Sequence, residues 1–418
     1  MVRKRKGETR MKKNTITRLL FCIVVAITFV LCMPNDTIVQ ATKEKKTYTI
    51  GPTSSPCDKS KKFTTYNKYT KQYYLIRSYL EKLEKEGGGT LVLKKGEYSI
   101  TNVLYVPSNV TIRLKKGVVL KKGNKTGTSK FKPSGTMITL LPPSKQNVKG
   151  KITKYNGTKN VKIIGEGNPV IDLNYYKDGN AIILGHNQNV EIKGITFKNM
   201  NAGHFIEMDA SKNVTISKCT FMNHKDSYSN GKEAINIDTP DKETKGFNVT
   251  WSAQDKTPNY NVKIQDCTFK KLERAIGTHK YSQNKLHSKI VITGNKIDGC
   301  DNDAIRVMNW RDVSITNNTI KNVGKAGDGK RAILVSGASQ ITITGNTFQR
   351  VSRAMQFIAW KNTGAGEKYK TIYNELTQKE IKAMQKNVIK DVDETFFRIN
   401  KVYNEYIKDT EKYEITGK

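Results

Sequence analysis

Three short segments of this sequence share one pattern: EAINID at residues 233–238, RAIGTH at 274–279 and DAIRVM at 303–308. In each, a polar residue precedes Ala-Ile, and apolar and variable positions then alternate, as in a β-strand with one buried face. HFIEMD at 204–209 fits the same pattern one copy earlier, and further copies start at residues 180, 331 and 353. The segments are therefore copies of one repeated strand.

A second repeated strand follows each copy, with a pattern like Asn-Val-Thr-Ile, as at residues 213–216, 261–264 and 312–315. The first set of strands starts at intervals of 24, 29, 41, 29, 28 and 22 residues. A period in this range, with short β-branched strands and Asn/Gly turns, predicts a solenoid in which each repeat buries its face on the next. With two short strands per repeat and no helical period between them, the sequence predicts an all-β protein, a parallel β-helix.

The segment that leads into these repeats resembles a known family. An apolar helical face between residues 72 and 86 precedes GGGTLVLKKGEY at 87–98, and VPSNVTI follows at 106–112. This order is similar to the start of the pectate-lyase-like superfamily, and the resemblance covers about residues 70–360. It implies a right-handed parallel β-helix with an N-terminal capping helix, in a secreted protein similar to polysaccharide lyases. The same superfamily also holds hydrolases, epimerases and binding proteins.

The chain is expected to have four parts. Residues 1–41 contain Lys12-Lys13, an apolar run and a small-residue site ending at Ala41, which together predict a signal peptide. The apolar run is shorter than the roughly 20 residues of a membrane-spanning helix, so we expect secretion and no stable membrane span after cleavage. Residues 42–70 are expected to be a loose lead-in, 71–360 the β-helix domain and 361–418 a partly helical cap or tail.

The formal net charge is +36, and removal of residues 1–41 would leave 65 basic and 35 acidic residues, a charge of +30. Outside a cell, such a charge predicts an acidic polysaccharide or another anionic polymer as partner, and it favours attachment to anionic cell surfaces. Nucleic acid is not expected, because no nucleic-acid-binding motif is present. Cys219 and Cys267 occupy the same slot in successive repeats, so we expect a buried ladder rather than a disulfide. The oligomeric state is left open.

Polar side chains gather on the outward side of four consecutive repeats. Strand alternation places Ile and the residue two positions later inside, and the residues between them outside. Three outward columns follow across coils about 4.8 Å apart: His204/Glu233/Arg274/Asp303, Glu207/Asn236/Gly277/Arg306 and Asp209/Asp238/His279/Met308. The flanking repeats carry apolar or small residues at these positions, so the sequence predicts a functional site on these four coils.

Several roles are predicted within this site. Carboxylates at strand spacing repel one another unless they are neutralised, which favours Ca²⁺ with the ligands Glu207, Asp209, Glu233 and Asp238. The predicted substrate-binding residues are Asn236, His204, Trp251 and Trp310. Each Trp can stack on a sugar ring or pack a turn. Gly277 is expected to leave a gap in which a sugar lies against the sheet.

The preferred reaction is β-elimination on an acidic polysaccharide. It requires neutralisation of a uronate carboxylate, abstraction of a proton and protonation of the leaving oxygen. The predicted catalytic residues are His279, Lys280, Arg274, Arg306 and Tyr281, with His279 or Lys280 as the base. Three alternatives remain: a hydrolase using Asp209, Glu233 and Asp238, a C5-epimerase, and a non-enzymatic cell-surface binding protein. A hydrolase of the inverting type would need carboxylates roughly 6.5–9.5 Å apart.

Overall fold

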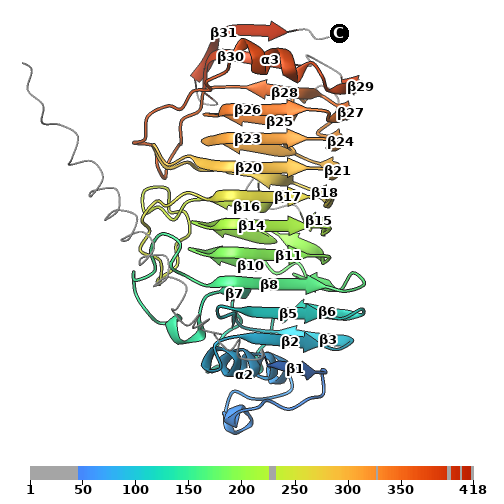
Figure 1. The fold of residues 1–418 in the computed structure, drawn as a ribbon, viewed down its shortest axis with the longest axis vertical. Coiled ribbons are helices and arrows are strands. Elements are labelled where there is room, and N and C mark those ends of the chain that lie inside the picture. Colours follow the sequence, from blue (N-terminus) through green and yellow to red (C-terminus); the bar gives the residue numbers. More distant parts are fainter. Residues whose placement is uncertain (1–45, 226–231, 326–327, 393–396, 405–406, 416–418) are drawn as a thin grey trace, which may run out of the picture. The chain divides into compact units, whose positions relative to one another are not determined.

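The computed structural model describes residues 46–225, 232–325, 328–392, 397–404 and 407–415. The predicted signal peptide lies outside the described residues. Successive coils of the chain stack on one another, and their strands form three sheets, called A, B and C below (Figure 1), which are parallel except for the last strand of sheet C. This confirms the predicted parallel β-helix. Most coils carry three strands rather than the expected two, because the segment after each Asn-Val-Thr-Ile-like strand forms a further strand.

Sheet A contains β1 (Thr47–Ile50), β2 (Gly89–Leu93), β5 (Val110–Leu114), β8 (Lys159–Gly165), β11 (Gln188–Lys193), β14 (Lys212–Ser217), β17 (Tyr260–Gln265), β20 (His287–Thr293), β23 (Trp310–Thr316) and β26 (Ser339–Thr344). Sheet B contains β3 (Gly96–Ile100), β6 (Val118–Lys122), β9 (Val170–Asp172), β12 (Thr196–Asn201), β15 (Thr220–Lys225), β18 (Thr268–Leu272), β21 (Lys296–Cys300), β24 (Thr319–Val323), β27 (Thr347–Val351) and β29 (Val388–Val392). Sheet C contains β4 (Leu104–Tyr105), β7 (Thr136–Leu140), β10 (Asn180–Gly185), β13 (Ile206–Asp209), β16 (Glu233–Asp238), β19 (Arg274–Gly277), β22 (Ile305–Met308), β25 (Arg331–Ser336), β28 (Arg353–Phe357), β30 (Phe397–Asn404) and β31 (Ile407–Ile415). The helical segments are η1 (Lys59–Lys62), α2 (Lys71–Lys85), η2 (Pro143–Lys145) and α3 (Gln378–Met384).

The core is a set of side-chain columns running from coil to coil. Ile235, Ile276 and Ile305 are register partners in adjacent strands of sheet C, and none has exposed surface. Phe221 stacks on Phe269 with ring centroids 4.9 Å apart, close to the spacing of the strands themselves. Each coil buries its apolar face on the coils next to it. The repeated Ile of the sequence therefore predicts this periodic core.

A column of asparagines makes the bend that leads into sheet A. Asn160, Asn189, Asn213 and Asn261 all have φ between 55° and 57°, a left-handed conformation that Asn adopts more readily than most residues. Each side-chain amide donates to the carboxamide oxygen of the Asn one coil earlier, at 2.8–3.0 Å. The repeated Asn therefore fixes the same turn in successive coils.

Each end of the β-helix has the expected helix and, in addition, strands that the sequence did not predict. The N-terminal end is covered by α2, as predicted, but residues 46–70 are not loose, because β1 pairs with β2 and adds a strand to sheet A. At the other end, α3 packs on β26, while β29 and β30 extend sheets B and C. The β-helix thus continues past Trp360, where the repeated pattern is lost from the sequence. In the described part of the chain, the helices are too short or too polar to span a membrane.

Candidate functional site on sheet C

The predicted outward columns are present on sheet C. Glu207 pairs in register with Asn236, Asn236 with Gly277, and Gly277 with Arg306. A second column begins with Asp209 and Asp238. The residues predicted to share an outward column are therefore neighbours on sheet C. The contacts of each side chain then determine its role.

Four loops that follow the C-terminal ends of sheet C strands line one edge of this site. We call residues 141–158, 239–259, 278–286 and 358–377 the loop wall, which lies on the left in Figure 1. Gly150 N donates to Thr250 O at 2.9 Å, which joins the first loop to the second. Buried Asp241 accepts hydrogen bonds from Ser282 Oγ at 2.5 Å and Tyr369 Oη at 2.7 Å, which joins the other three. Sequence reasoning found the long second loop but not this connection.

A buried ion-pair network lies at the start of the sheet C strands. Arg274 Nη1 donates to Glu233 Oε1 at 2.9 Å, and Arg274 Nη2 lies 3.6 Å from Asp303 Oδ2. Arg331 Nε lies 2.8 Å from the other oxygen of Asp303. Burial opposes ionisation of Glu233, but His279 and Arg274 outweigh it and lower the pKa of this carboxyl. Arg274 is only 3% exposed and its guanidinium is engaged by Glu233 and Asp303, so it fits a role in holding the network together better than the predicted role against substrate.

His279 lies between two buried carboxylates. Its Nδ1 is 3.2 Å from Glu233 Oε2, and its Nε2 is 3.5 Å from Asp238 Oδ2. Burial alone would lower the pKa of His279, but the Asp238 and Glu233 carboxylates raise it to about 9. The ring is therefore a cation at neutral pH with both nitrogens facing carboxylates, and it does not fit the predicted role of base.

Two carboxyls of the site are held in an environment that disfavours their charge. Burial, followed by the charge of Glu207 and Glu233, raises the pKa of Asp238 to about 6, against the opposing effect of His279. Burial raises the pKa of Asp209 well above its ordinary value, and the Glu207 and Asp238 carboxylates add to this. Asp209 has no exposed surface, and neither of its carboxylate oxygens meets a hydrogen-bond donor among the described residues.

Lys280, which belongs to the loop wall, and Arg306 form the cationic part of the site. Lys280 Nζ donates to Thr363 O of the wall. Burial and the nearby Arg306 lower the pKa of Lys280, although Asp238 opposes this. The Arg306 guanidinium lies over the Trp360 ring at 4.1 Å from its centroid. The prediction did not include Trp360 among the site residues. The one available signal in the sequence was its position directly after the last repeat at 353–358.

The three aromatic residues that were predicted to bind substrate or to act in catalysis pack inside the protein instead. Trp310 has no exposed surface and donates from Nε1 to Thr278 Oγ1 at 2.9 Å inside the core, so it cannot stack on a sugar. Trp251 is 4% exposed and packs edge-on against Phe247 in the loop wall. Tyr281 is fully buried, donates to Lys370 O, and burial raises its pKa to about 12. These three assignments to substrate binding or catalysis do not fit the structure.

The expected gap at Gly277 is also filled. A Cβ at this position would lie 2.8 Å from Arg306 O and 2.9 Å from Arg306 Cβ. The glycine therefore permits the close approach of the next strand. His204 and Asn236 are both buried and bind site residues: His204 Nδ1 lies 2.6 Å from Glu233 O, and Asn236 Nδ2 donates to Glu207.

The four predicted calcium ligands do not surround one point. Glu207 accepts a hydrogen bond from Asn236, and Glu233 forms ion pairs with Arg274 and His279. Within the described ranges, the only three His, Cys, Asp or Glu residues with ligand atoms within 4.8 Å of one another are His204, Glu233 and His279. These same atoms form the contacts given above. These contacts do not favour calcium; its binding by the four carboxylates stays an untested prediction, and no step below is derived through a metal.

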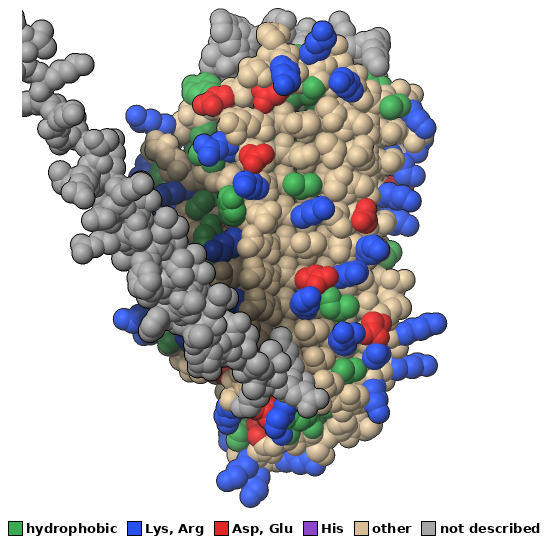
Figure 2. All heavy atoms as spheres, viewed as in Figure 1, with side chains coloured by type: hydrophobic (Ala, Val, Ile, Leu, Met, Phe, Trp, Pro, Cys, Tyr) green, Lys and Arg blue, Asp and Glu red, His purple; other side chains and the backbone are tan. Residues whose placement is uncertain are grey.

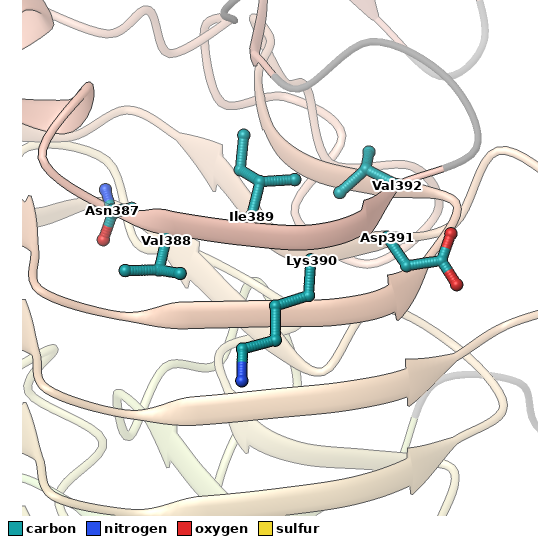
Figure 3. Close-up of a pocket in the computed structure, with 6 residues that line it drawn as sticks. All are labelled: Asn387, Val388, Ile389, Lys390, Asp391 and Val392. Atoms are coloured by element: carbon teal, nitrogen blue, oxygen red, sulfur yellow. The ribbon is translucent and has the colours of Figure 1, made fainter.

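Neither the charges on the face drawn in Figure 2 nor the hollow beside β29 defines a rival site. Figure 2 shows Lys and Arg spread over one face with Asp and Glu among them, rather than gathered in one patch. A hollow of about 460 Å³ lies beside β29 near the C-terminal end, lined by residues 387–392 (Figure 3). Val388 and Lys390 point to one side of this strand, and Ile389 and Val392 point to the other. This hollow brings no cluster of catalytic groups together.

The fold and this face of sheet C define a class of protein. The model of the family described as "right handed beta helix region" matches residues 117–320 and 283–366, more than half of the chain. The protein belongs to this family, and the predicted right-handed parallel β-helix is confirmed.

One similar sequence and two similar solved structures come from Streptococcus pneumoniae. Plasmin and fibronectin-binding protein A of Streptococcus pneumoniae is 26% identical over 253 residues, which is 56% of this chain and 34% of the relative. The chain thus spans about a third of that protein's length. A solved structure described as the S. pneumoniae surface protein and adhesin PfbA matches with a TM-score of 0.57 at 18% identity, covering 79% of this chain and 87% of that chain. A second PfbA crystal structure matches with a TM-score of 0.52 at 17% identity, covering 79% of this chain and 85% of that chain. These likenesses show the fold.

Proposed function

We propose that this is a secreted or cell-surface protein that binds an acidic polysaccharide on sheet C and cleaves it by β-elimination. The observation that supports this most strongly is the cluster of charged side chains, most of them buried, on four adjacent coils of sheet C beside the loop wall. Ionised groups inside a protein are costly unless they are paired or used. The similarity to surface adhesins and the charge of +36 support a location outside the cell and an anionic partner.

Lys280 is the base in this proposal. Its lowered pKa makes the neutral amine more accessible, and its hydrogen bond to Thr363 O leaves a lone pair for the substrate. His279, whose side chain is 32% exposed, acts instead as a fixed cation that offsets the charge of Glu233 and Asp238 beside the bound uronate. Arg306, on the neighbouring strand and stacked on Trp360, adds positive charge where the enolate-like intermediate forms.

A second candidate is binding without cleavage. Its specific support is the PfbA match, because those structures are described as a surface adhesin. In this case the same cations on sheet C would hold an anionic chain, and the buried carboxyls would only position them.

The test is a screen of the secreted form on pectate, alginate, hyaluronate, chondroitin and glucuronan. Ultraviolet absorbance detects the unsaturated product of elimination, reducing ends without absorbance indicate hydrolysis, and exchange of the C5 proton without cleavage indicates epimerisation. We expect an absorbing product from at least one polymer. Tight binding with no change in any polymer would overturn the enzymatic proposal and favour the binding protein.

Variants then test the base. Lys280→Ala should lower turnover on the order of 10²–10⁴-fold while binding is largely kept. Lys285→Ala is the matched control, because Lys285 is exposed and lies in the same loop. Equal turnover in both variants would exclude Lys280 as the base.

A further inference from the structure

Two segments at the N-terminal end of the β-helix are rich in lysine and poor in acidic residues. We call residues 58–71 and 125–132 the lysine lobe; the first runs from the connection after β1 to the start of α2, and the second lies between β6 and β7. Together they contain eight basic residues and one acidic residue, which gives a formal net charge of +7. The basic residues are all exposed lysines: Lys59, Lys61, Lys62, Lys68, Lys71, Lys125, Lys130 and Lys132.

The protein itself does not neutralise these charges. Within the described ranges, none of the eight lysines forms an ion pair, and the one acid, Asp58, accepts a hydrogen bond from the backbone at the start of η1. The body of the β-helix differs, because its cations lie among carboxylates. Lys115 Nζ is 2.6 Å from Glu166 Oε2, and Lys162 Nζ is 3.2 Å from Glu191 Oε2. The lysine lobe therefore favours a partner that supplies negative charge.

The two segments of the lysine lobe are held in one fixed arrangement. Asn67 Nδ2 of the first segment donates to Thr126 O of the second at 2.8 Å. Tyr74 of α2 packs against an aromatic ring from each segment, with ring centroids 5.5 Å from Phe63 and 6.5 Å from Phe131. The lysines are thus presented on an ordered platform, and binding through them does not have to order the backbone first.

Two aromatic side chains are exposed among the lysines. Phe63 is 42% exposed and Tyr69 is 39% exposed. Lys62 directly precedes Phe63, and the Lys68 ammonium lies 5.2 Å from the centroid of the Tyr69 ring. Aromatic rings of this kind prefer the headgroup level of a lipid layer, and neighbouring lysines extend along the apolar surface to reach anionic groups.

The position of the lysine lobe favours a surface over a single polymer chain. Its first segment forms the blue loop that projects below α2 and β1 in Figure 1. Its second segment borders the same aromatic ring, because a Cβ at Gly127 would lie 2.4 Å from the Tyr69 ring. The lysines thus lie on both sides of this ring and do not follow one strand. A flat anionic layer can contact them together, whereas a polymer chain contacts only those along its path.

We propose that the lysine lobe docks this end of the β-helix on an anionic lipid surface, with its lysines at the lipid phosphates and with Phe63 and Tyr69 among the headgroups. This docking is peripheral and does not depend on the proposed function, since a protein without turnover would dock in the same way. The first coil of the sheet C site, which carries β13, lies two coils beyond β7, roughly 10 Å along the stack. Docking at the end of the stack therefore leaves the sheet C site open.

The first test is sedimentation of the secreted form with lipid vesicles. One set contains phosphatidylcholine alone, and the other contains about one third phosphatidylglycerol, an anionic lipid. We expect binding to the anionic vesicles only, and weaker binding as salt is added, because salt screens exposed charges. Equal binding to both sets, or no binding to the anionic vesicles at low salt, would overturn the proposal.

A triple variant then tests the lysine lobe itself. Lys59→Gln, Lys61→Gln and Lys62→Gln together should lower the vesicle partition constant on the order of 10²-fold, since each lysine near an anionic surface contributes about a factor of five. These side chains are exposed and form no ion pair with the described residues, so the variant should unfold at the same temperature as the wild type.

A matched triple variant removes the same charge from the body of the β-helix. Lys263→Gln, Lys270→Gln and Lys296→Gln change exposed positions of sheets A and B, and vesicle binding should fall much less. Equal losses in the two triple variants would show attraction by net charge alone and would overturn the lysine lobe as the docking surface. Soluble pectate bound through the lysine lobe, without vesicle binding, would overturn the lipid surface and favour a second polymer-binding surface.

Fluorescence tests the orientation of the docked protein. The native Trp251, Trp310 and Trp360 are at most 5% exposed, so vesicles should change their emission little. Phe63→Trp adds an exposed indole in the lysine lobe, and its emission should move to shorter wavelength with anionic vesicles. Tyr373→Trp, at a 56% exposed position in the loop wall, is the control and should not shift. A bound protein that shows no shift for Phe63→Trp, or an equal shift for both variants, would overturn docking through this end.

Discussion

His279 and Glu233 are 46 residues apart in the sequence and lie on adjacent coils, and Nδ1 of the first is 3.2 Å from Oε2 of the second, a carboxylate with no exposed surface. The contact crosses from the end of one strand to the start of its neighbour. It makes a histidine that looks like a base in the sequence into a fixed cation.

This ion pair predicts a pH dependence of stability. The pKa of His279 is raised from its ordinary value of about 6.5 to about 9, so its stabilising effect is complete below about pH 6.5 and is lost as pH rises through about 9. We expect the free energy of unfolding to fall over that window, by on the order of 1–3 kcal/mol. Denaturant unfolding at pH 6.5 and above pH 9 measures it. His279→Ala should remove most of the dependence; a wild type with equal stability at both pH values would contradict the pair.

The buried network predicts an unequal response to two similar substitutions. Glu233→Gln leaves the buried Arg274 without its closest carboxylate and should cost about 3–5 kcal/mol. Glu191→Gln breaks the surface pair with Lys162, at 3.2 Å, and should cost less than about 1 kcal/mol. Thermal or denaturant unfolding of both variants compares them, and similar costs would mean that the network is not the buried element described here.

The core position of Trp310 predicts loss of stability rather than loss of binding. Trp310→Ala removes a fully buried side chain and its bond to Thr278, and should cost about 3–5 kcal/mol. At a temperature where the variant is folded, its affinity for a bound polymer should equal that of the wild type. A large loss of affinity with normal stability would show that Trp310 contacts the sugar after all.

The contacts of the carboxylates predict independence from metal ions. Glu207 and Glu233 are already used by Asn236, Arg274 and His279, so excess chelator should leave polymer binding and turnover unchanged. The control is the same assay after calcium is restored. Activity that falls with chelator and returns with calcium would support the ligand set expected from the sequence and contradict the arrangement described here.

The sequence by itself determined the β-helix, its register and the face that carries the site. The Ala-Ile strands repeat every coil, and in a parallel stack equal positions must become neighbours, so the pairing of Glu207 with Asn236 and of Asn236 with Gly277 followed from spacing alone. The extension of the stack beyond Trp360 escaped notice, because β29 and β30 lack the Ala-Ile signature of the earlier coils.

Only the tertiary structure decided what each side chain in the site does. Strand alternation predicts that the side chains of Arg274 and Lys280 point away from the core. It does not predict that Arg274 is enclosed by Glu233 and Asp303, or that Lys280 donates to Thr363 O in another loop. The sequence does not distinguish the roles of Trp310 and Trp360. In the structure, Trp310 lies in the core and Trp360 stacks on Arg306. The physical reason is that burial and ionisation depend on contacts between loops and coils far apart in the chain, whereas the repeat depends only on local periodicity.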